Sequence, residues 1–354
     1  MTIFTPKTQF FLQMHFSGSA PFLFCYSIVI SQNSTEGRHG MGVEALMTSF
    51  KGFIDVHTHG IGRYDTRAGR PEDILQMAAL QAGEGGGAIL PTIYPDSIDK
   101  MRRNLEAVRK AMEMQKESGV RSRKPEVIIK NSGFPSSRIT NHTSLILGVH
   151  LEGPFLNPER CGSLDKKVFS KPTLSSLKKL LAGYEDIVKI ITVAPEIPGA
   201  LKVIEKCSEI GIKVNMGHSN ATYKQALEGK KAGATGITHL FNAMRPFHHR
   251  EPGLAGIGLI DEDLYIEVIA DGIHLHPMTL ELIFSIKRID RIILVSDSVK
   301  GKKAKNGAVY NKDGLLAGSG ITIGRVVKIL RAAGVSDAEI IKASTDNPAQ
   351  YIGL

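Results

Sequence analysis

Cysteine is scarce in this chain of 354 residues, and the three cysteines, Cys25, Cys161 and Cys207, lack the spacing of a metal site. A disulfide framework needs an even number of cysteines, and a thiolate zinc site needs closely spaced pairs. The sequence therefore argues against a thiolate zinc site and indicates a reduced, cytoplasmic compartment.

Long apolar runs are also lacking, since a helix that spans a bilayer takes about 20 apolar residues. The run from Ala20 to Ser31 is too short to span one. A secretory signal would need a basic start and a small-residue cleavage site, but only Lys7 precedes this run and no clear site follows. We expect neither secretion nor a membrane partner.

Positive charge is in excess but is not gathered into a basic stripe. The 44 basic and 35 acidic residues give a formal net charge of +9, and clusters such as Arg121–Lys124 and Gly301–Lys303 are short and scattered. Such clusters are typical of solvated surface, so we expect no nucleic-acid partner. An anionic small substrate would suit the charge without being required by it.

What the sequence does contain, from residue 52 onwards, is an alternation of strands and helices. Eight apolar segments have the composition of strands: Phe53–Val56, Gly87–Thr92, Leu145–Glu152, Val188–Val193, Lys213–Met216, Gly236–Thr238, Tyr265–Ala270 and Ile292–Val295. Helical segments lie between or after them: Pro71–Ala82, Ile98–Glu117, Ala200–Ile210, Pro277–Arg288 and Ile323–Ala333. Eight such units predict an α/β protein with a TIM-like (β/α)8 barrel over residues 51–354. Residues 1–50 form an atypical N-terminal segment with a linker-like end, and Met41 or Met47 could be the true start.

Polar side chains stand at the carboxyl ends of these strands, where a parallel barrel carries its chemistry. The most informative stretch is residues 148–158, where an apolar run ends in Glu152 and Gly153-Pro154 stops it. The polar residues at the strand ends are His57, His59, Glu152, His218, His239 and Asp297. A single such histidine is more often a packing residue, but imidazoles and a carboxylate at successive strand ends predict a site for zinc or a similar divalent ion.

The reaction class follows from the charge of that ion. A divalent cation lowers the pKa of a bound water from about 15.7 towards about 7, which predicts metal-assisted hydrolysis of a carbonyl compound. Asp297 would accept a proton from the water and return it to the leaving group. The alternative is that Asp297 only orients a histidine.

Several longer motifs carry a resemblance to a known family. They are HLEGPF (150–155), GHSNA (217–221), THLFNAM (238–244), PFHHREPG (246–253), DGIHL (271–275), SDS (296–298) and LAGS (316–319). With His57-x-His59 they resemble the amidohydrolase superfamily and, within it, the N-acetylglucosamine-6-phosphate deacetylases. The resemblance runs from about residue 52 to the end of the chain. It implies hydrolysis of the N-acetyl group of N-acetylglucosamine 6-phosphate.

The resemblance also implies roles for individual residues. Glu152, His218 and His239 match the principal metal ligands, His57 and His59 the pair that supports a second metal, and Asp297 the general acid/base. The substrate-binding positions that it implies are Asn242, Ala243, Arg250, His274, Leu316, Ala317 and Gly318. The cofactor would be one or two divalent ions, zinc first, with Fe²⁺, Co²⁺ or Mn²⁺ as alternatives. The partner would be an amino-sugar phosphate, and a homodimer is one possible assembly.

The sequence departs from this family in three places. Relatives carry a substrate-contacting histidine twelve residues after the metal-binding glutamate, where this chain has Leu164. Ser163 could supply a hydroxyl instead, although its side chain is short. The N-terminus does not resemble the family's first half of a small β-sandwich, and the chain ends at Leu354 before the closing strands, so we expect that sandwich to be largely missing.

These departures leave alternatives open. The chain could be a degenerate, non-catalytic barrel that binds metal or sugar phosphate, or a deacetylase of another N-acetylhexosamine 6-phosphate. A cyclic-amide or dipeptide hydrolase is disfavoured by the phosphate-type segments around Asn242 and Arg250.

Overall fold

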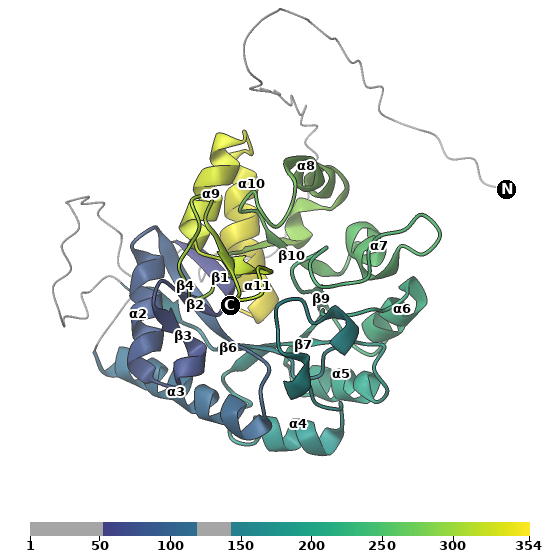
Figure 1. Ribbon diagram of the computed structural model, residues 1–354, viewed down its shortest axis with the longest axis horizontal. Coiled ribbons are helices and arrows are strands. Elements are labelled where there is room, and N and C mark those ends of the chain that lie inside the picture. Colours follow the sequence, from purple (N-terminus) through teal and green to yellow (C-terminus); the bar gives the residue numbers. More distant parts are fainter. Residues whose placement is uncertain (1–51, 119–142) are drawn as a thin grey trace, which may run out of the picture. The chain divides into compact units, whose positions relative to one another are not determined.

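A computed structural model describes residues 52–118 and 143–354, so the expectation for residues 1–50 lies outside the described part. Eight strands form one parallel sheet in chain order (Figure 1). They are β1 (Phe53–Thr58), β4 (Gly86–Ile93), β6 (Val149–Glu152), β7 (Val188–Val193), β8 (Lys213–Met216), β9 (Gly236–Ile237), β10 (Tyr265–Ile269) and β11 (Ile292–Val295). The first and last strands meet where the Asp297 amide donates to the His57 carbonyl at 2.9 Å. The predicted TIM-like barrel is confirmed.

Helices surround the sheet and cover its outer face. They are α2 (Pro71–Ala82), α3 (Ile98–Glu117), α4 (Leu174–Leu181), α5 (Ala200–Glu209), α6 (Tyr223–Lys231), α7 (Gly253–Ile260), α8 (Pro277–Ile286) and α9 (Ile323–Ala332). Helix α3 shows why the helices pack on the sheet: Met101, Leu105 and Val108 recur at helical spacing, form one apolar side of the helix and are fully buried. Inside the barrel, a separate apolar cluster includes Ile54, Leu90, Ile190 and Val295.

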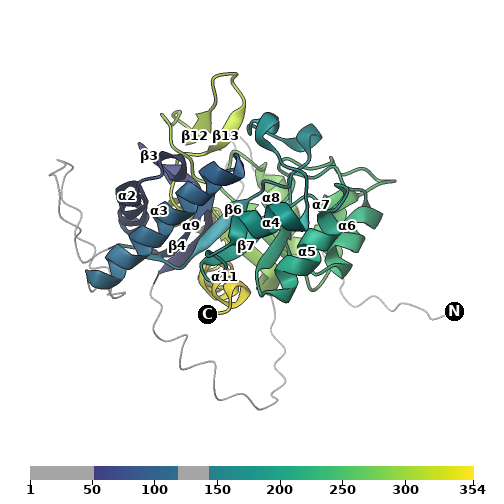
Figure 2. The ribbon, with the colours of Figure 1, turned by 90° about the horizontal axis from the view of Figure 1, so that it is seen from below.

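Smaller elements close the two ends of the barrel. Strands β12 (Ala308–Tyr310) and β13 (Leu316–Ser319) form an antiparallel hairpin that joins the barrel through a bridge between Ser319 and Ser298. Helix α11 (Asn347–Ile352) follows α10 (Asp337–Ile341) and lies at the opposite end (Figure 2). Buried Tyr351 of α11 belongs to the interior cluster. The segment Leu316–Gly318, where the resemblance places substrate-binding residues, is part of strand β13.

The expected strand Leu145–Glu152 is two strands, β5 (Leu145–Ile146) and β6. Gly148 separates them with φ of +148°, a conformation that is open to glycine and rarely to other residues. A Cβ at this position would lie 2.5 Å from the Ile187 carbonyl oxygen. The continuous strand was wrong because the apolar run does not show where the backbone turns.

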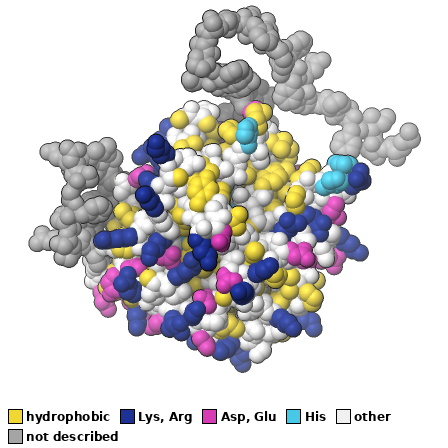
Figure 3. Space-filling model, in the orientation of Figure 1, with side chains coloured by type: hydrophobic (Ala, Val, Ile, Leu, Met, Phe, Trp, Pro, Cys, Tyr) yellow, Lys and Arg dark blue, Asp and Glu magenta, His cyan; other side chains and the backbone are white. Residues whose placement is uncertain are grey.

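The surface agrees with the expected scatter of charge. On the face shown in Figure 3, lysine and arginine side chains are interspersed with acidic ones and do not form a continuous stripe. Among the helices of the described residues, none has the length and apolar character to cross a membrane.

Candidate metal centre

Six side chains from five different strand ends converge at one end of the barrel. His57 lies in β1 and His59 follows it, Glu152 ends β6, and His218, His239 and Asp297 lie two residues after β8, β9 and β11. All are buried except Asp297, whose side chain is 13% exposed. The barrel places these residues together because the carboxyl ends of its parallel strands share one rim.

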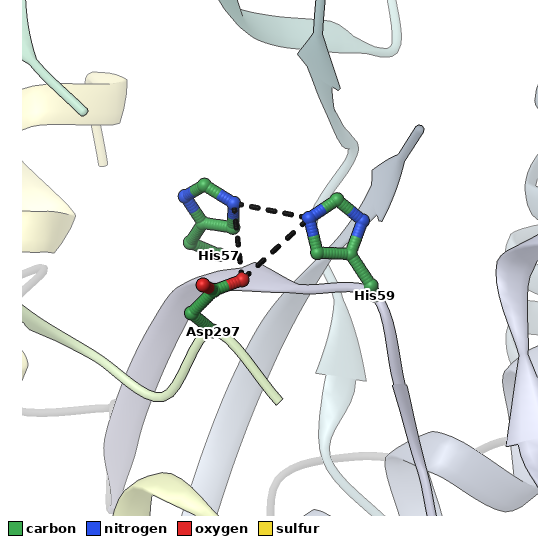
Figure 4. Close-up of side chains that lie close together, drawn as sticks. All are labelled: His57, His59 and Asp297. Carbon is green, nitrogen blue, oxygen red and sulfur yellow. Dashed lines mark hydrogen bonds and ion pairs between the residues drawn. The ribbon is translucent and has the colours of Figure 1, made fainter. Parts of the chain in front are cut away.

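Glu152 lies between two groups of ligand atoms. Its Oε1 atom lies 3.1 Å from Nε2 of both His218 and His239. Its Oε2 atom lies 3.3 Å from His59 Nε2. On that side, Asp297 Oδ1 lies 3.6 Å from Nε2 of both His57 and His59 (Figure 4). The carboxylate of Glu152 can therefore touch two cation positions at once.

Hydrogen bonds to Nδ1 of the imidazole rings show that Nε2 is the nitrogen available to a metal ion. Nδ1 of His59 and of His218 face the carbonyl oxygens of Thr92 and Arg160, at 3.1 and 2.9 Å. A carbonyl only accepts, so both rings carry their proton on Nδ1 and present a lone pair from Nε2. When these rings are neutral, carboxylates and imidazole lone pairs face one another across about 3 Å, which is unfavourable unless a cation lies between them. The donor set suits divalent ions of the zinc type.

Burial and charge act on the titration of this cluster in opposite directions. Burial favours the protonated form of Glu152, but the positive charge of His218 and His59, when these rings are protonated, outweighs it and holds the pKa of Glu152 well below its usual range. Glu152 is consequently an ionised carboxylate at neutral pH, which is the form that binds a cation.

Three of the six residues have strained backbone conformations. His218, His239 and Asp297 have φ of 47°, 28° and 44°, in the left-handed region that non-glycine residues seldom adopt. Such conformations cost of the order of 1–3 kcal/mol each and cluster at functional sites. The turns after β8, β9 and β11 thus hold these side chains at a cost in stability.

A second buried layer lies behind the cluster and was not expected from the sequence. Glu267, in the middle of β10, accepts a hydrogen bond from His57 Nδ1 at 2.8 Å. His150 lies beside it, but its two ring nitrogens already face the Val56 carbonyl and the Thr192 hydroxyl, at 3.0 and 2.9 Å. Burial, together with the nearby His57, lowers the pKa of His150 to about 4, so this ring is neutral. The available signal was a carboxylate inside the apolar strand Tyr265–Ile269.

The expected substrate positions lie at different distances from the cluster. A Cβ on Gly318 would lie 2.7 Å from the Asp297 carbonyl oxygen, so β13, which also contains Leu316 and Ala317, passes beside Asp297. A Cβ on Gly162 would contact Ala243 at 3.4 Å and the ring of His218 at 3.6 Å. Asn242, next in the turn, donates to the carbonyls of His239 and Leu240.

The ring of His274 is hydrogen-bonded to the buried carboxylate of Asp271. Its Nδ1 atom lies 2.8 Å from Asp271 Oδ2, and the same carboxylate accepts its backbone amide. Burial disfavours the charged ring, but the hydrogen bond and charge of Asp271 outweigh it and raise the pKa of His274. The protonated form of this ring would be suited to binding an anionic group.

Arg250 is not brought to the cluster. It lies in an exposed loop, where its Nη1 atom contacts His249 Nε2 at 2.9 Å.

Leu164 packs against a buried apolar cluster made of Tyr94, Val299 and Val309. Tyr94 in turn stacks on His59 with 3.8 Å between ring centroids. The residue that departs from the family therefore lies beside the metal centre.

A parallel (β/α)8 barrel with clustered histidines and carboxylates at its carboxyl-end rim defines the class of metal-dependent hydrolase barrels. Within this class, the model of the amidohydrolase family matches residues 50–354, and the chain belongs to that family. Its buried groups are consistent with the two-metal site typical of amidohydrolases.

Individual relatives show which members of the family this chain is similar to. The N-acetylglucosamine-6-phosphate deacetylase of Lysinibacillus sphaericus is 32% identical over 335 residues, covering 89% of this chain and 80% of that protein. The N-acetylgalactosamine-6-phosphate deacetylase of Escherichia coli O157:H7 is 29% identical over 317 residues, covering 85% and 77%. The chain is thus similar to deacetylases of two different hexosamine phosphates.

Solved structures agree with the sequence comparison. The N-acetylglucosamine-6-phosphate deacetylase of Thermotoga maritima superposes with a TM-score of 0.71 at 30% identity, covering 86% of this chain and 78% of that one. A variant of the Mycobacterium smegmatis enzyme in complex with N-acetyl-D-glucosamine-6-phosphate gives a TM-score of 0.72 at 26% identity, with the same coverage.

Proposed function

We propose that this protein is a metal-dependent deacetylase that hydrolyses N-acetylglucosamine 6-phosphate to glucosamine 6-phosphate and acetate. The observation that carries the proposal is the position of Glu152 between two sets of imidazole nitrogens at the barrel rim. The similarity to deacetylases of N-acetylhexosamine phosphates supports this substrate class. The free cysteines Cys161 and Cys207 suit a cytoplasmic location, which belongs to the same proposal.

The metal ligands divide into two sets that share Glu152. His218 and His239 would hold one ion with Glu152, and His57, His59 and Asp297 would hold the other. Zinc is the first candidate because the ligands are imidazoles and carboxylates. When bound, such ions make water nucleophilic near neutral pH and polarise a carbonyl group.

The remaining steps fall to side chains of the chain itself. Asp297, the most exposed of the six, accepts the proton of the attacking water and returns it to the amide nitrogen as the C–N bond breaks. The turn at Asn242 and Ala243 and the strand Leu316–Gly318 line the sugar. His274 supplies positive charge for the phosphate. Arg250 is a further phosphate contact in this proposal, and its exposed loop would have to bring it there.

Acetate release tests the proposal. The full chain, supplied with zinc, is assayed with N-acetylglucosamine 6-phosphate, N-acetylgalactosamine 6-phosphate and unphosphorylated N-acetylglucosamine. We expect the highest kcat/KM for the first and a large loss without the phosphate. A higher value for the galactosamine compound would assign the other hexosamine. Metal binding without acetate release from any of the three would favour the non-catalytic barrel, which Leu164 motivates.

A further inference from the structure

A line of buried polar side chains crosses the barrel interior from the metal centre to the C-terminal helix. His57 Nδ1 lies 2.8 Å from Glu267 Oε2, and Glu267 Oε1 lies 2.7 Å from Asn215 Nδ2. At the far end, Asn215 Oδ1 contacts the hydroxyl of Tyr351 on α11 at 2.5 Å. All four side chains are at most 2% exposed. Isolated polar groups are costly at such positions, so a connected line needs an explanation.

The direction of each hydrogen bond is determined by the carboxylate. An ionised carboxylate can only accept, so both His57 Nδ1 and Asn215 Nδ2 donate to Glu267. The amide oxygen of Asn215 must then face Tyr351, whose hydroxyl donates to it. His57 consequently carries a proton on Nδ1 and directs Nε2 towards Glu152 and Asp297, so Nε2 is the nitrogen available to a metal ion.

The neighbouring strand leaves room for this line. A Cβ at Gly236 of β9 would lie 2.3 Å from Asn215 Oδ1 and 2.6 Å from the Tyr351 hydroxyl oxygen. Glycine at this position is therefore a steric requirement for the contact between Asn215 and Tyr351. The observation is independent of the hydrogen bonds themselves.

A third metal site at His57, His150 and Glu267 is the competing explanation, because their ligand atoms lie within 4.8 Å of one another. Both nitrogens of His150 are already in hydrogen bonds, and both oxygens of Glu267 accept from side chains. The group is satisfied without an ion, which favours a positioning role.

We propose that Glu267, oriented by Asn215 and Tyr351, is a positioning residue that fixes the tautomer and ring direction of His57. Because Tyr351 belongs to α11, this line of hydrogen bonds makes helix α11 contribute to the affinity of the protein for the ion that His57 and His59 would hold. The inference rests on the proposed metal centre. Loss of a partner that orients a metal ligand typically costs about 10- to 100-fold in metal affinity.

Glu267→Gln tests the proposal with almost no change of shape. An amide has one accepting oxygen for two donors, so either His57 or Asn215 is left facing an NH2 group. Zinc binding to the metal-free full chain is followed by calorimetry in the parent and in the variant. We expect the second of two ions to bind about 10- to 100-fold more weakly while the first keeps its parent affinity. Tyr351→Phe should weaken the same ion by less.

The matched control is Asp73→Asn, which also neutralises a buried carboxylate. Asp73 lies on α2 and pairs with Arg70 at 2.9 Å, so both ions should bind as in the parent. Parent-like binding of both ions by Glu267→Gln would overturn the inference, as would an equal weakening of both with a lower melting temperature. If Glu267→Gln does not fold, unchanged second-ion affinity in Tyr351→Phe overturns it. A parent that binds no ion would refute the proposed function and this inference with it.

Discussion

Asp297, the proton carrier in the proposed mechanism, is held by backbone hydrogen bonds on both sides. Its amide donates to the His57 carbonyl at 2.9 Å, and its carbonyl accepts from the Ser319 amide at 3.0 Å. The strained φ of 44° is thereby supported by the first barrel strand and by the hairpin. These bonds fix the backbone from which the Asp297 side chain extends.

Asp297→Asn keeps the size and polarity of the side chain but removes its ability to accept a proton. We expect kcat to fall by at least about 10²-fold, which is the lower range for general acid–base catalysis. Acetate release and metal content, measured on the same sample, check this. Binding of an unreactive substrate analogue should persist. A kcat near that of the parent would leave Asp297 only an orienting role.

Leu164 is the residue at which activity should be improvable. A donor aimed at the developing oxyanion is typically worth about 10²- to 10³-fold in kcat, and leucine provides none. Because Leu164 packs against Tyr94, which stacks on His59, a histidine at 164 would stand beside the metal centre. We expect Leu164→His to raise kcat on N-acetylglucosamine 6-phosphate. Leu164→Ala, which removes the same packing without adding a donor, should not raise it.

His274 should make substrate affinity depend on pH in a predictable direction. Its pKa is raised above 6.5, so the positive ring is present below that value and is lost as the pH rises through its folded-state pKa. KM for the phosphorylated sugar should therefore rise in that alkaline window. Asp271→Asn removes the charge that raises the pKa, so the rise in KM should move to lower pH. NMR titration of the ring measures the shift directly, and an unchanged KM profile would contradict the role.

At the scale of elements, hydrophobic periodicity predicted a large part of the fold. The bounds of α2, α3, β7, β8 and β11 agree with those expected, because each lies between clear breaks of glycine, proline or charge. The hairpin β12–β13 was not expected, since strands of three and four residues carry too little pattern. The site could be predicted where polar residues end strands, whereas Glu267 was missed because it lies within one.

Gly148 provides a test of the break between β5 and β6. Gly148→Ala would put a Cβ 2.5 Å from the Ile187 carbonyl oxygen at φ of +148°, so we expect a loss of about 2–4 kcal/mol in the free energy of unfolding. Gly183→Ala is the control, because its φ is +81° and no atom lies within 4 Å of the added carbon. It should cost only about 1–2 kcal/mol. Urea unfolding of both variants decides, and equal losses would contradict a steric role for Gly148.

At the scale of the whole molecule, the metal centre links parts of the chain that are distant in sequence. Its ligands span positions 57 to 297 and come from five strands, while the line through Glu267 extends to Tyr351. An ion that binds only the folded chain stabilises it by mass action, by about 2.7 kcal/mol at a free concentration of 100 times its Kd. Metal content and global stability should therefore change together.

We expect two divalent ions per chain at saturation, and removal of both by a chelator should lower the melting temperature by several degrees. Without ions, the buried carboxylates around Glu152 lose the cations that balance their charge, which destabilises the folded state. Elemental analysis and thermal unfolding of the parent are compared with a His57→Ala/His59→Ala variant. That variant should retain one ion, held by Glu152, His218 and His239, and should show about half of the chelator-induced shift. A single ion in the parent, unchanged in the double variant, would show that the second ligand set holds no metal.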